Sequence, residues 1–382
     1  MARLFGRTYT REELLSRVTR VEQLGGVRRV TLASGLEAGT EALELRTGTG
    51  LCCTLAASRA LDLATAEWQG RSLGWRGGAG VAHPSFFDPS GLNWLRTYFG
   101  GLLTTCGLTW FGAPHQDPDS GNAEGPSLGL HGRISHLPAE QVNCGGQWEG
   151  DDYVMWVEGT VREWMLSGPH LELRRRWWAR LGENRLHLRD VVTNCAYVEQ
   201  EHMILYHFNP GFPLLDEGAR FVFPSRRVLP RTPFAQSCVD QWDRVGAPQP
   251  GPEPEAVYYH TVAADQSGRT VAALVNRATD PAQPLGLALR YDPRVLPVLA
   301  QWKNPRAGSY VTGLEPCTNR LDGRPAERAA GRMIVLEPGE SRTYEIEVEV
   351  LTTEAELAAL ELEVAELTGG APAEIAPEPA TS

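Results

Sequence analysis

The feature that most constrains the fold of this chain is the near absence of long helical periodicity between Gly25 and Val350. Over that length the sequence consists of short apolar segments separated by Gly, Pro, Asn or Asp. Strict alternation of apolar and polar residues over 344–350 and 185–189 is typical of half-buried strands. The triplet 182–184 precedes the second of these segments and predicts a hairpin turn. Many strands at short intervals predict an all-β protein, built as a β-sandwich or barrel.

Changes in pattern divide the chain into three predicted regions. Residues 1–25 are an N-terminal helical extension, in which Thr10 and Glu13 have the spacing of a capping box. Residues 26–352 are the β-sandwich domain. Residues 353–382 are an acidic helix followed by an Ala/Pro/Glu tail, which we expect to be disordered because it has little apolar surface to bury.

The predicted C-terminal helix has an apolar face. Residues 354–367 place Leu357, Leu360, Val364 and Leu367 at helical spacing on one side. This face could dock on the sandwich or on a second copy of the chain. The sequence therefore leaves the oligomeric state open, with a homo-oligomer as one of the two outcomes.

The charge of the chain excludes several classes of partner. The net charge is −11, but residues 353–382 contribute seven acidic side chains and no basic one, so the rest is only mildly acidic. Without a basic patch we expect no nucleic-acid partner. No apolar run reaches the roughly 18 residues of a membrane-spanning helix, and we expect no membrane partner. Residues 1–20 lack the apolar core of a secretory signal, so a cytoplasmic location is expected.

Cysteine and lysine usage adds two further constraints. The seven cysteines include no pair at the two-residue spacing of a metal knuckle, so no metal site is expected. Of the 36 basic residues, Lys303 is the one lysine. Because ammonium and guanidinium groups are not interchangeable, this lysine draws attention to its neighbours in the sequence.

Five segments are dense in polar groups that strands do not need for folding. General acid–base chemistry requires a carboxylate that accepts a proton and a group, usually His, that donates one. Taken singly, a His beside Gly or an aromatic residue is more often structural, but the combination of these segments favours a functional site. The segments are 82–85, 130–135, 206–213, 301–306 and 313–320.

Several of these motifs resemble a known family. The matching stretches are 100–108, 129–135, 206–209 and 301–303 leading into 313–316. In these motifs and in their order, the chain is similar to the galactose mutarotase-like (aldose 1-epimerase-like) superfamily, and within it to the uncharacterised DUF4432 family. The resemblance extends over roughly residues 59–350. It implies a large antiparallel β-sandwich with a sugar cleft on one concave sheet.

The resemblance also implies catalytic roles for three residues. Glu315 matches the base that acts on the anomeric hydroxyl. His207, in the stretch His207-Phe208-Asn209, matches the acid that acts on the ring oxygen. His131 matches an earlier histidine beside the same sugar ring, so the choice between the two histidines as general acid remains open.

Further residues are expected to bind the substrate. Arg133 lies where related sugar-binding arginines occur, and Lys303 is expected in the pocket, where it would bind an anionic group or pair with Glu315. The aspartate that assists the substrate hydroxyls in the family has no secure match, and Asp216 and Asp265 both remain open. The expected binding residues are Arg133, Lys303, Asn209, His83 and Arg320.

Together these residues predict a carbohydrate epimerase that interconverts the anomers of an aldose or aldose derivative. Its Glu and His would open and close the sugar ring by acid–base catalysis, and no cofactor is expected. The expected partner is a small sugar, either neutral, acidic or phosphorylated. Two alternatives remain: a non-catalytic carbohydrate-binding protein, and a sugar isomerase or C2 epimerase that uses the same cleft.

Overall fold

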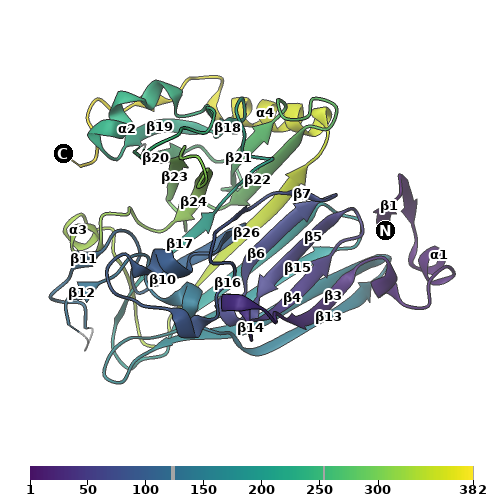
Figure 1. Ribbon diagram of the computed structural model, residues 1–382, viewed down its shortest axis with the longest axis horizontal. Helices are drawn as coiled ribbons and strands as arrows, with labels where there is room; N and C mark the ends of the chain where they lie inside the picture. The colour runs from purple at the N-terminus through teal and green to yellow at the C-terminus, as the bar shows by residue number, and fades with distance from the viewer. Residues whose placement is uncertain (122–124, 253, 382) are drawn as a thin grey trace.

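Long antiparallel sheets make up most of the protein (Figure 1). The computed structural model describes residues 1–121, 125–252 and 254–381. In this part of the chain strands far outweigh helices, and their pairing is almost entirely antiparallel. The all-β class that the alternating segments predict is therefore confirmed.

One sheet contains the longest strands, and we call it the long-strand sheet. The predicted hairpin turn at 182–184 joins two of its strands, β15 and β16. The two alternating segments of the sequence pair with each other in β16 and β26, where Leu186 lies opposite Val348. In sheet order the strands are β13 (Glu140–Glu149), β14 (Asp152–Trp164), β15 (His170–Arg180), β16 (Arg185–Asn194), β26 (Ser341–Leu351), β22 (Leu285–Tyr291), β21 (Thr270–Asn276) and β18 (Arg220–Val222).

A second sheet packs against the first, and we call it the site sheet. Its strand β17 also pairs at its beginning with the short β25 (Ile334–Leu336). In sheet order the strands are β10 (Leu103–Leu108), β17 (Gln200–Phe208), β24 (Val311–Cys317), β23 (Val298–Asn304), β20 (Ala256–Val262), β19 (Ser225–Pro230) and β27 (Glu374–Ile375).

The remaining strands form smaller sheets in the first third of the chain. The largest of these contains β3 (Gly26–Thr31), β4 (Glu41–Arg46), β5 (Leu51–Ala56), β6 (Asp62–Trp68) and β7 (Arg71–Ser72). The pairs are β1 (Ala2–Leu4) with β2 (Arg7–Tyr9), β8 (Trp75–Arg76) with β9 (Gly100–Gly101), and β11 (His115–Gln116) with β12 (Ser127–Leu128).

The main core lies between the sheets, and β17 separates it from a second apolar cluster. Ile204, Tyr206 and Phe208 belong to the main core, whereas Met203 and Leu205 belong to the second cluster. Consecutive residues of a strand point to opposite faces, so this strand has one side in the main core and one side away from it.

The short helices are α1 (Arg11–Leu15), α2 (Pro233–Ser237), α3 (Arg324–Ala329) and the longer α4 (Glu354–Thr368). The predicted capping box at the start of α1 is confirmed, because Thr10 Oγ1 accepts a hydrogen bond from the Glu13 amide. The apolar face of α4 packs on the chain's own long-strand sheet, across β21 and β22 (Figure 1). Leu357 and Leu360 are buried there.

The segment after α4 differs from the prediction of disorder. Its strand β27 adds in parallel to the edge of β19, and the Ala380 and Thr381 amides donate to the carbonyls of Pro230 and Arg231. An edge strand offers unpaired backbone groups to any extended segment that can reach it, whatever the composition of that segment. Composition alone therefore gave the wrong expectation for this tail.

Candidate active site

Two neighbouring strands of the site sheet bring His207 and Glu315 together. Strand β17 pairs antiparallel with β24, with Leu205 opposite Cys317 and Phe208 opposite Leu314, so that His207 lies opposite Glu315. Their side chains share the sheet face that points away from the main core, which we call the site face. The His207 Nε2 and Glu315 Oε1 atoms are 3.3 Å apart, and the side chains are only 7% and 2% exposed.

The sequence around Glu315 leaves room for the carboxyl group to fold back along its own strand. A Cβ atom at Gly313 would lie 2.0 Å from Glu315 Oε1, a distance that real atoms do not reach. Only glycine is therefore compatible with this carboxyl position. The Gly-Leu-Glu order of the motif accordingly has a direct steric cause.

His131 approaches the pair from a loop outside the sheet. Its backbone has a positive φ of 58°, and the Gly107 amide donates to its carbonyl oxygen. The next residue, Gly132, passes so close to the Gly107 and Trp110 carbonyls that a Cβ would lie 2.4 Å from each. This tight passage holds the His131 ring 5.8 Å from the His207 ring, measured between ring centroids.

Aromatic rings surround the two histidines. The Trp94 ring stacks on Tyr98 at 4.7 Å and lies 5.0 Å from His131. The His207 ring is 5.9 Å from Tyr98 and meets Trp302 edge-on at 5.5 Å. Flat apolar rings beside a few polar groups are the usual lining of a site for small ligands.

Several buried polar atoms of this region have no hydrogen-bond partner among the described residues. Buried polar groups are paired in the great majority of cases, so a cluster of exceptions calls for an explanation. The Nε2–Oε1 approach within the pair does not have hydrogen-bond geometry. The unpartnered atoms are Trp94 Nε1, His131 Nδ1, His207 Nδ1 and Glu315 Oε1.

Burial shifts the pKa values of the pair in opposite directions. Loss of solvation raises the pKa of Glu315 to about 8, and the positive charge of Arg231 only partly opposes this shift. Loss of solvation lowers the pKa of His207 to about 4, and the neighbouring Asn209 side chain partly opposes this shift. Burial, followed by the charges of His207 and Arg231, also keeps the pKa of His131 well below its usual value.

At neutral pH the His207–Glu315 pair therefore carries one proton in total. Although 3.3 Å is within ion-pair distance, burial favours the uncharged form, with the proton on Glu315. The charged form, with the proton on His207, is a tautomer of the same state. Because the two groups interact, the values near 4 and 8 belong to the pair rather than to either residue alone.

Arg231 is a site residue that the sequence motifs did not reveal. It follows β19, three strands away from β24, and it contacts Asp322 Oδ1 at 3.4 Å. Its charge lowers the pKa of Glu315 and so favours the carboxylate form. No local pattern marks it, because its role depends on which strands are neighbours in the sheet.

Asn209 positions the site but does not face it. Its Nδ2 donates to the carbonyls of Gly100 and His207, at 2.9 and 2.7 Å, and its Oδ1 accepts from the Tyr98 hydroxyl. The residue is fully buried. These bonds use its polar atoms, which corrects the expectation that Asn209 binds substrate.

Lys303 lies on the opposite face of the site sheet, which corrects its expected place in the pocket. Because Trp302 points to the site face, its neighbour on β23 points the other way. The Lys303 Nζ donates to the carbonyls of Gln241 and Arg244, at 2.8 and 2.7 Å. Burial lowers the pKa of Lys303 to about 8, and neither of its expected roles fits this position.

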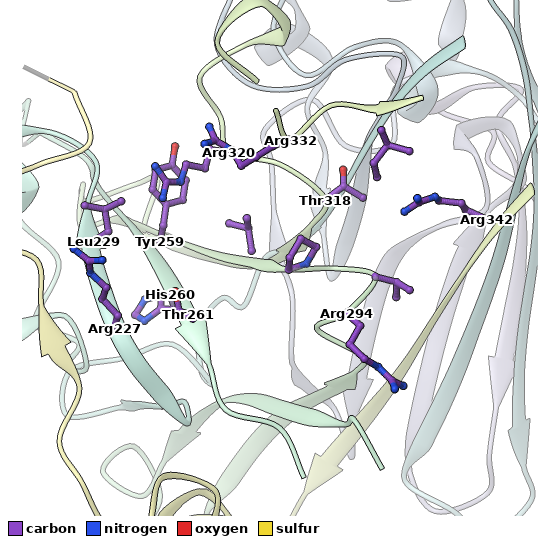
Figure 2. A pocket seen from close by; sticks show the side chains of 14 residues that line it. Arg227, Leu229, Tyr259, His260, Thr261, Arg294, Thr318, Arg320, Arg332 and Arg342 are labelled. Carbon is purple, nitrogen blue, oxygen red and sulfur yellow. The ribbon is translucent and has the colours of Figure 1, made fainter. Parts of the chain in front are cut away.

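The remaining three expected binding residues cap or line other parts of the structure. His83 caps the 3₁₀ turn Pro84–Phe86 by accepting from the Ser85 amide. Arg133 lines a hollow with Trp110 and His115, outside the site sheet. Arg320 lies over the Tyr259 ring, at 5.4 Å from its centroid, and lines a different pocket (Figure 2).

Neither candidate aspartate is placed at the site. Asp216 accepts a hydrogen bond from Thr279, and Asp265 accepts from Ser267 and Arg269 within one turn.

Over the described ranges, no group of three or more His, Cys, Asp or Glu side chains is arranged to hold a metal ion. None of the helices in the same ranges combines the length and apolarity that a membrane span requires.

Comparisons with known proteins assign the fold. A family model described as a domain of unknown function, DUF4432, matches residues 37–350. A structure from Klebsiella pneumoniae, provisionally described as an aldose 1-epimerase, has 29% sequence identity and a TM-score of 0.86, covering 95% of this chain and 94% of that chain. No curated protein matches the chain.

More distant structures share the fold at low sequence identity. A galactose mutarotase-like protein from Clostridium acetobutylicum has a TM-score of 0.58 and 12% identity, over 87% of this chain and 100% of that chain. A galactose 1-epimerase from Lactobacillus acidophilus has a TM-score of 0.55 and 11% identity, over 86% of this chain and 100% of that chain. The expected mutarotase-like sandwich is confirmed.

Proposed function

Because the chain belongs to the DUF4432 family, with the fold of galactose mutarotase-like proteins, we propose that it is a carbohydrate epimerase that interconverts the anomers of an aldose or aldose derivative. One observation carries this proposal. A buried His207–Glu315 pair, which shares one proton at neutral pH, lies among aromatic rings with polar atoms that no described residue satisfies.

The proton balance of ring opening suits such a pair. In its charged form, Glu315 accepts the proton of the sugar C1 hydroxyl while His207 donates a proton to the ring oxygen. The C1–O5 bond breaks, the C1 carbonyl forms, and the pair is left uncharged. After rotation about the C1–C2 bond, ring closure moves both protons back and restores the charged form.

The two tautomers of the pair are thus the two ends of one chemical step. Burial favours the uncharged form, whereas Arg231 and hydrogen bonds from sugar hydroxyls to the carboxylate favour the charged form. The aromatic rings offer apolar faces for the C–H surfaces of a sugar. His131 lies beside His207, but its pKa makes it a neutral donor or acceptor toward a sugar hydroxyl.

The test is saturation-exchange NMR between α and β anomers, over a panel of neutral sugars, uronic acids and sugar phosphates. Wild type is compared with Glu315→Gln and with a matched control, Glu158→Gln, which removes a partly exposed carboxylate of β14. We expect one sugar class to exchange faster with wild type and the control, and at the buffer rate with Glu315→Gln.

Two results would replace this proposal by another function. If no sugar exchanges faster than in buffer although some bind, the protein is a carbohydrate-binding protein. If deuterium from the solvent enters C2 of a bound sugar, the same pair acts at carbon, and the protein is an isomerase or C2 epimerase.

A further inference from the structure

A buried arginine, Arg59, links the turns of the chain that carry three rings of the site. It ends the 3₁₀ turn Ala57–Arg59, which joins β5 to β6, and the residue is fully buried. No carboxylate of a described residue forms an ion pair with it, and Asp62, whose charge reaches it, pairs with Arg175 instead. Because a buried cation without an ion-pair partner is costly, its hydrogen bonds call for an explanation.

The nitrogen atoms of the Arg59 guanidinium all donate to turns outside its own strand pair. Nε donates to the Ser135 carbonyl, and Nη1 donates to the Ala82 carbonyl at 2.8 Å. Nη2 donates to the Thr97 carbonyl at 3.2 Å and to His136 Nε2 at 2.8 Å. The rigid, planar fork of an arginine reaches several acceptors at once, which the single ammonium of a lysine cannot do in the same geometry.

His136 completes this cluster as a neutral acceptor. Burial, followed by the charge of Arg59, holds the pKa of His136 well below its usual value, so the ring stays uncharged at neutral pH. The Thr97 hydroxyl lies 2.9 Å from the same Nε2 atom, and the Trp94 ring meets the imidazole edge-on at 6.0 Å. The turn that contains Trp94 is therefore fastened to the turn that ends at His136.

The two turns carry the rings that surround the proposed catalytic pair. One turn contains Trp94 and is followed directly by Tyr98, and the other begins three residues after His131. The Trp94 ring lies 5.0 Å from His131, and the Tyr98 ring lies 5.9 Å from His207. The burial of the pair therefore depends on where these two turns are held.

We propose that Arg59 is a positioning residue of the site, which fixes the two turns so that their rings close over the His207–Glu315 pair. The inference deepens the proposed function and rests on it for the role of the pair. Arg59 forms none of its hydrogen bonds with the pair, so it acts through the turns. If the turns loosen, water reaches the pair, and the pKa of Glu315 falls toward its ordinary value.

The test is a ¹³C NMR titration of the Glu315 side-chain carboxyl group in wild type, Arg59→Met and Arg324→Met. The resonance is assigned by its absence in Glu315→Gln. Arg324 is the matched control, because it is also buried but its side chain pairs with Asp117 and Glu201, outside the two turns. We expect Glu315 to titrate at least about one pH unit lower in Arg59→Met than in wild type, and at an unchanged pH in Arg324→Met.

Two milder variants keep the test decisive if Arg59→Met does not fold. Arg59→Lys keeps the charge but fewer of the hydrogen bonds, and His136→Leu removes one acceptor of Arg59. Each should lower the pH at which Glu315 titrates, by less than Arg59→Met does.

The proposal is overturned if Glu315 in the folded variants titrates as it does in wild type, or if Arg324→Met lowers its titration equally. Arg59 would then support the fold alone. A wild type in which Glu315 already titrates near 4.5 would also overturn it. A wild type that exchanges no sugar anomers would contradict the proposed function instead, and it would leave this titration readable.

Discussion

Tyr206 and His207 are consecutive residues of β17, and the polar groups around them are organised in opposite ways. On the core side, the Tyr206 hydroxyl donates to Asp190, which in turn accepts two hydrogen bonds from Arg175 at 2.9 and 2.7 Å. Arg175 also donates to Asp62 at 2.6 Å and to Thr105 at 2.8 Å. Although every member is buried, the Arg175 guanidinium lies between the two carboxylates, and the donors and acceptors are matched.

On the site face, His207 and Glu315 are equally buried, but each keeps a polar atom without a partner. The same loss of solvation acts on both sides of the strand. In the Arg175 cluster, burial raises the pKa of Asp62, but the charge of Arg175 and the hydrogen bonds from Thr105 and Arg175 oppose this shift. For Glu315, only the charge of Arg231 opposes the effect of burial. Buried polar groups with matched partners therefore stabilise the fold, whereas the buried pair without such partners keeps a proton that it can transfer.

The largest expected effect is the loss of catalysis in Glu315→Gln. The variant keeps the shape of the side chain but cannot accept a proton, so anomer exchange should fall by about 10²–10⁴-fold. The free energy of unfolding, measured with denaturant, should not fall below that of wild type, because a buried carboxyl group is replaced by a neutral one. If Glu315→Gln instead unfolds more easily, and its activity falls only as far as the folded fraction does, then Glu315 supports the fold rather than catalysis. The two faces of β17 would then not differ in the way proposed.

The core side should respond in the opposite way. Arg175→Met leaves Asp62 and Asp190 buried without a counter-charge, and should lower the free energy of unfolding by about 3–5 kcal/mol. Arg176→Met is the matched control, since its partly exposed ion pair with Glu158 should be worth less than about 1 kcal/mol. Equal unfolding energies of the two variants would show that the Arg175 cluster does not support the fold.

The pH dependence of anomer exchange should report the single proton of the pair. Below a pH of about 4 the pair gains a second proton, and above about 8 it loses its only one, so kcat/KM should fall on both sides of this window. Rates measured from pH 3 to pH 10, with stability checked at each pH, test this expectation. If kcat/KM instead changes only once with pH, near the ordinary pKa of histidine, a solvated histidine acts without Glu315.

The smallest effect is expected for Lys303→Met. Because Lys303 points away from the site face, anomer exchange per folded molecule should stay within about twofold of wild type. The same NMR assay measures it. A large loss of activity in a normally folded variant would show that Lys303 acts at the site, and it would contradict the orientation of Lys303 on β23.

The sequence motifs predicted the fold, and they singled out His207 and Glu315, which the structure brings together. Glu315 lies two residues after Gly313, where a Cβ atom would meet the carboxyl oxygen, and His207 lies opposite Glu315 on the neighbouring strand. The motifs could not place Lys303, because a shift of one residue decides whether Trp302 or Lys303 points to the site face.

Arg231 and the C-terminal tail escaped prediction for a related reason. The charge of Arg231 reaches Glu315 only because of the order of strands in the sheet, and the tail is ordered only because the edge of β19 accepts it. Both effects come from tertiary neighbours, which the composition and periodicity of one segment do not contain.

The central claim is that the buried His207–Glu315 pair carries one proton at neutral pH, with burial favouring its position on Glu315. Its most direct test is a ¹³C NMR titration of glutamate side-chain carboxyl groups, with the Glu315 resonance assigned by its absence in Glu315→Gln. The account predicts that this resonance titrates near pH 8. Titration near the ordinary value of 4.5 would show that Glu315 is a solvated carboxylate and would contradict the claim.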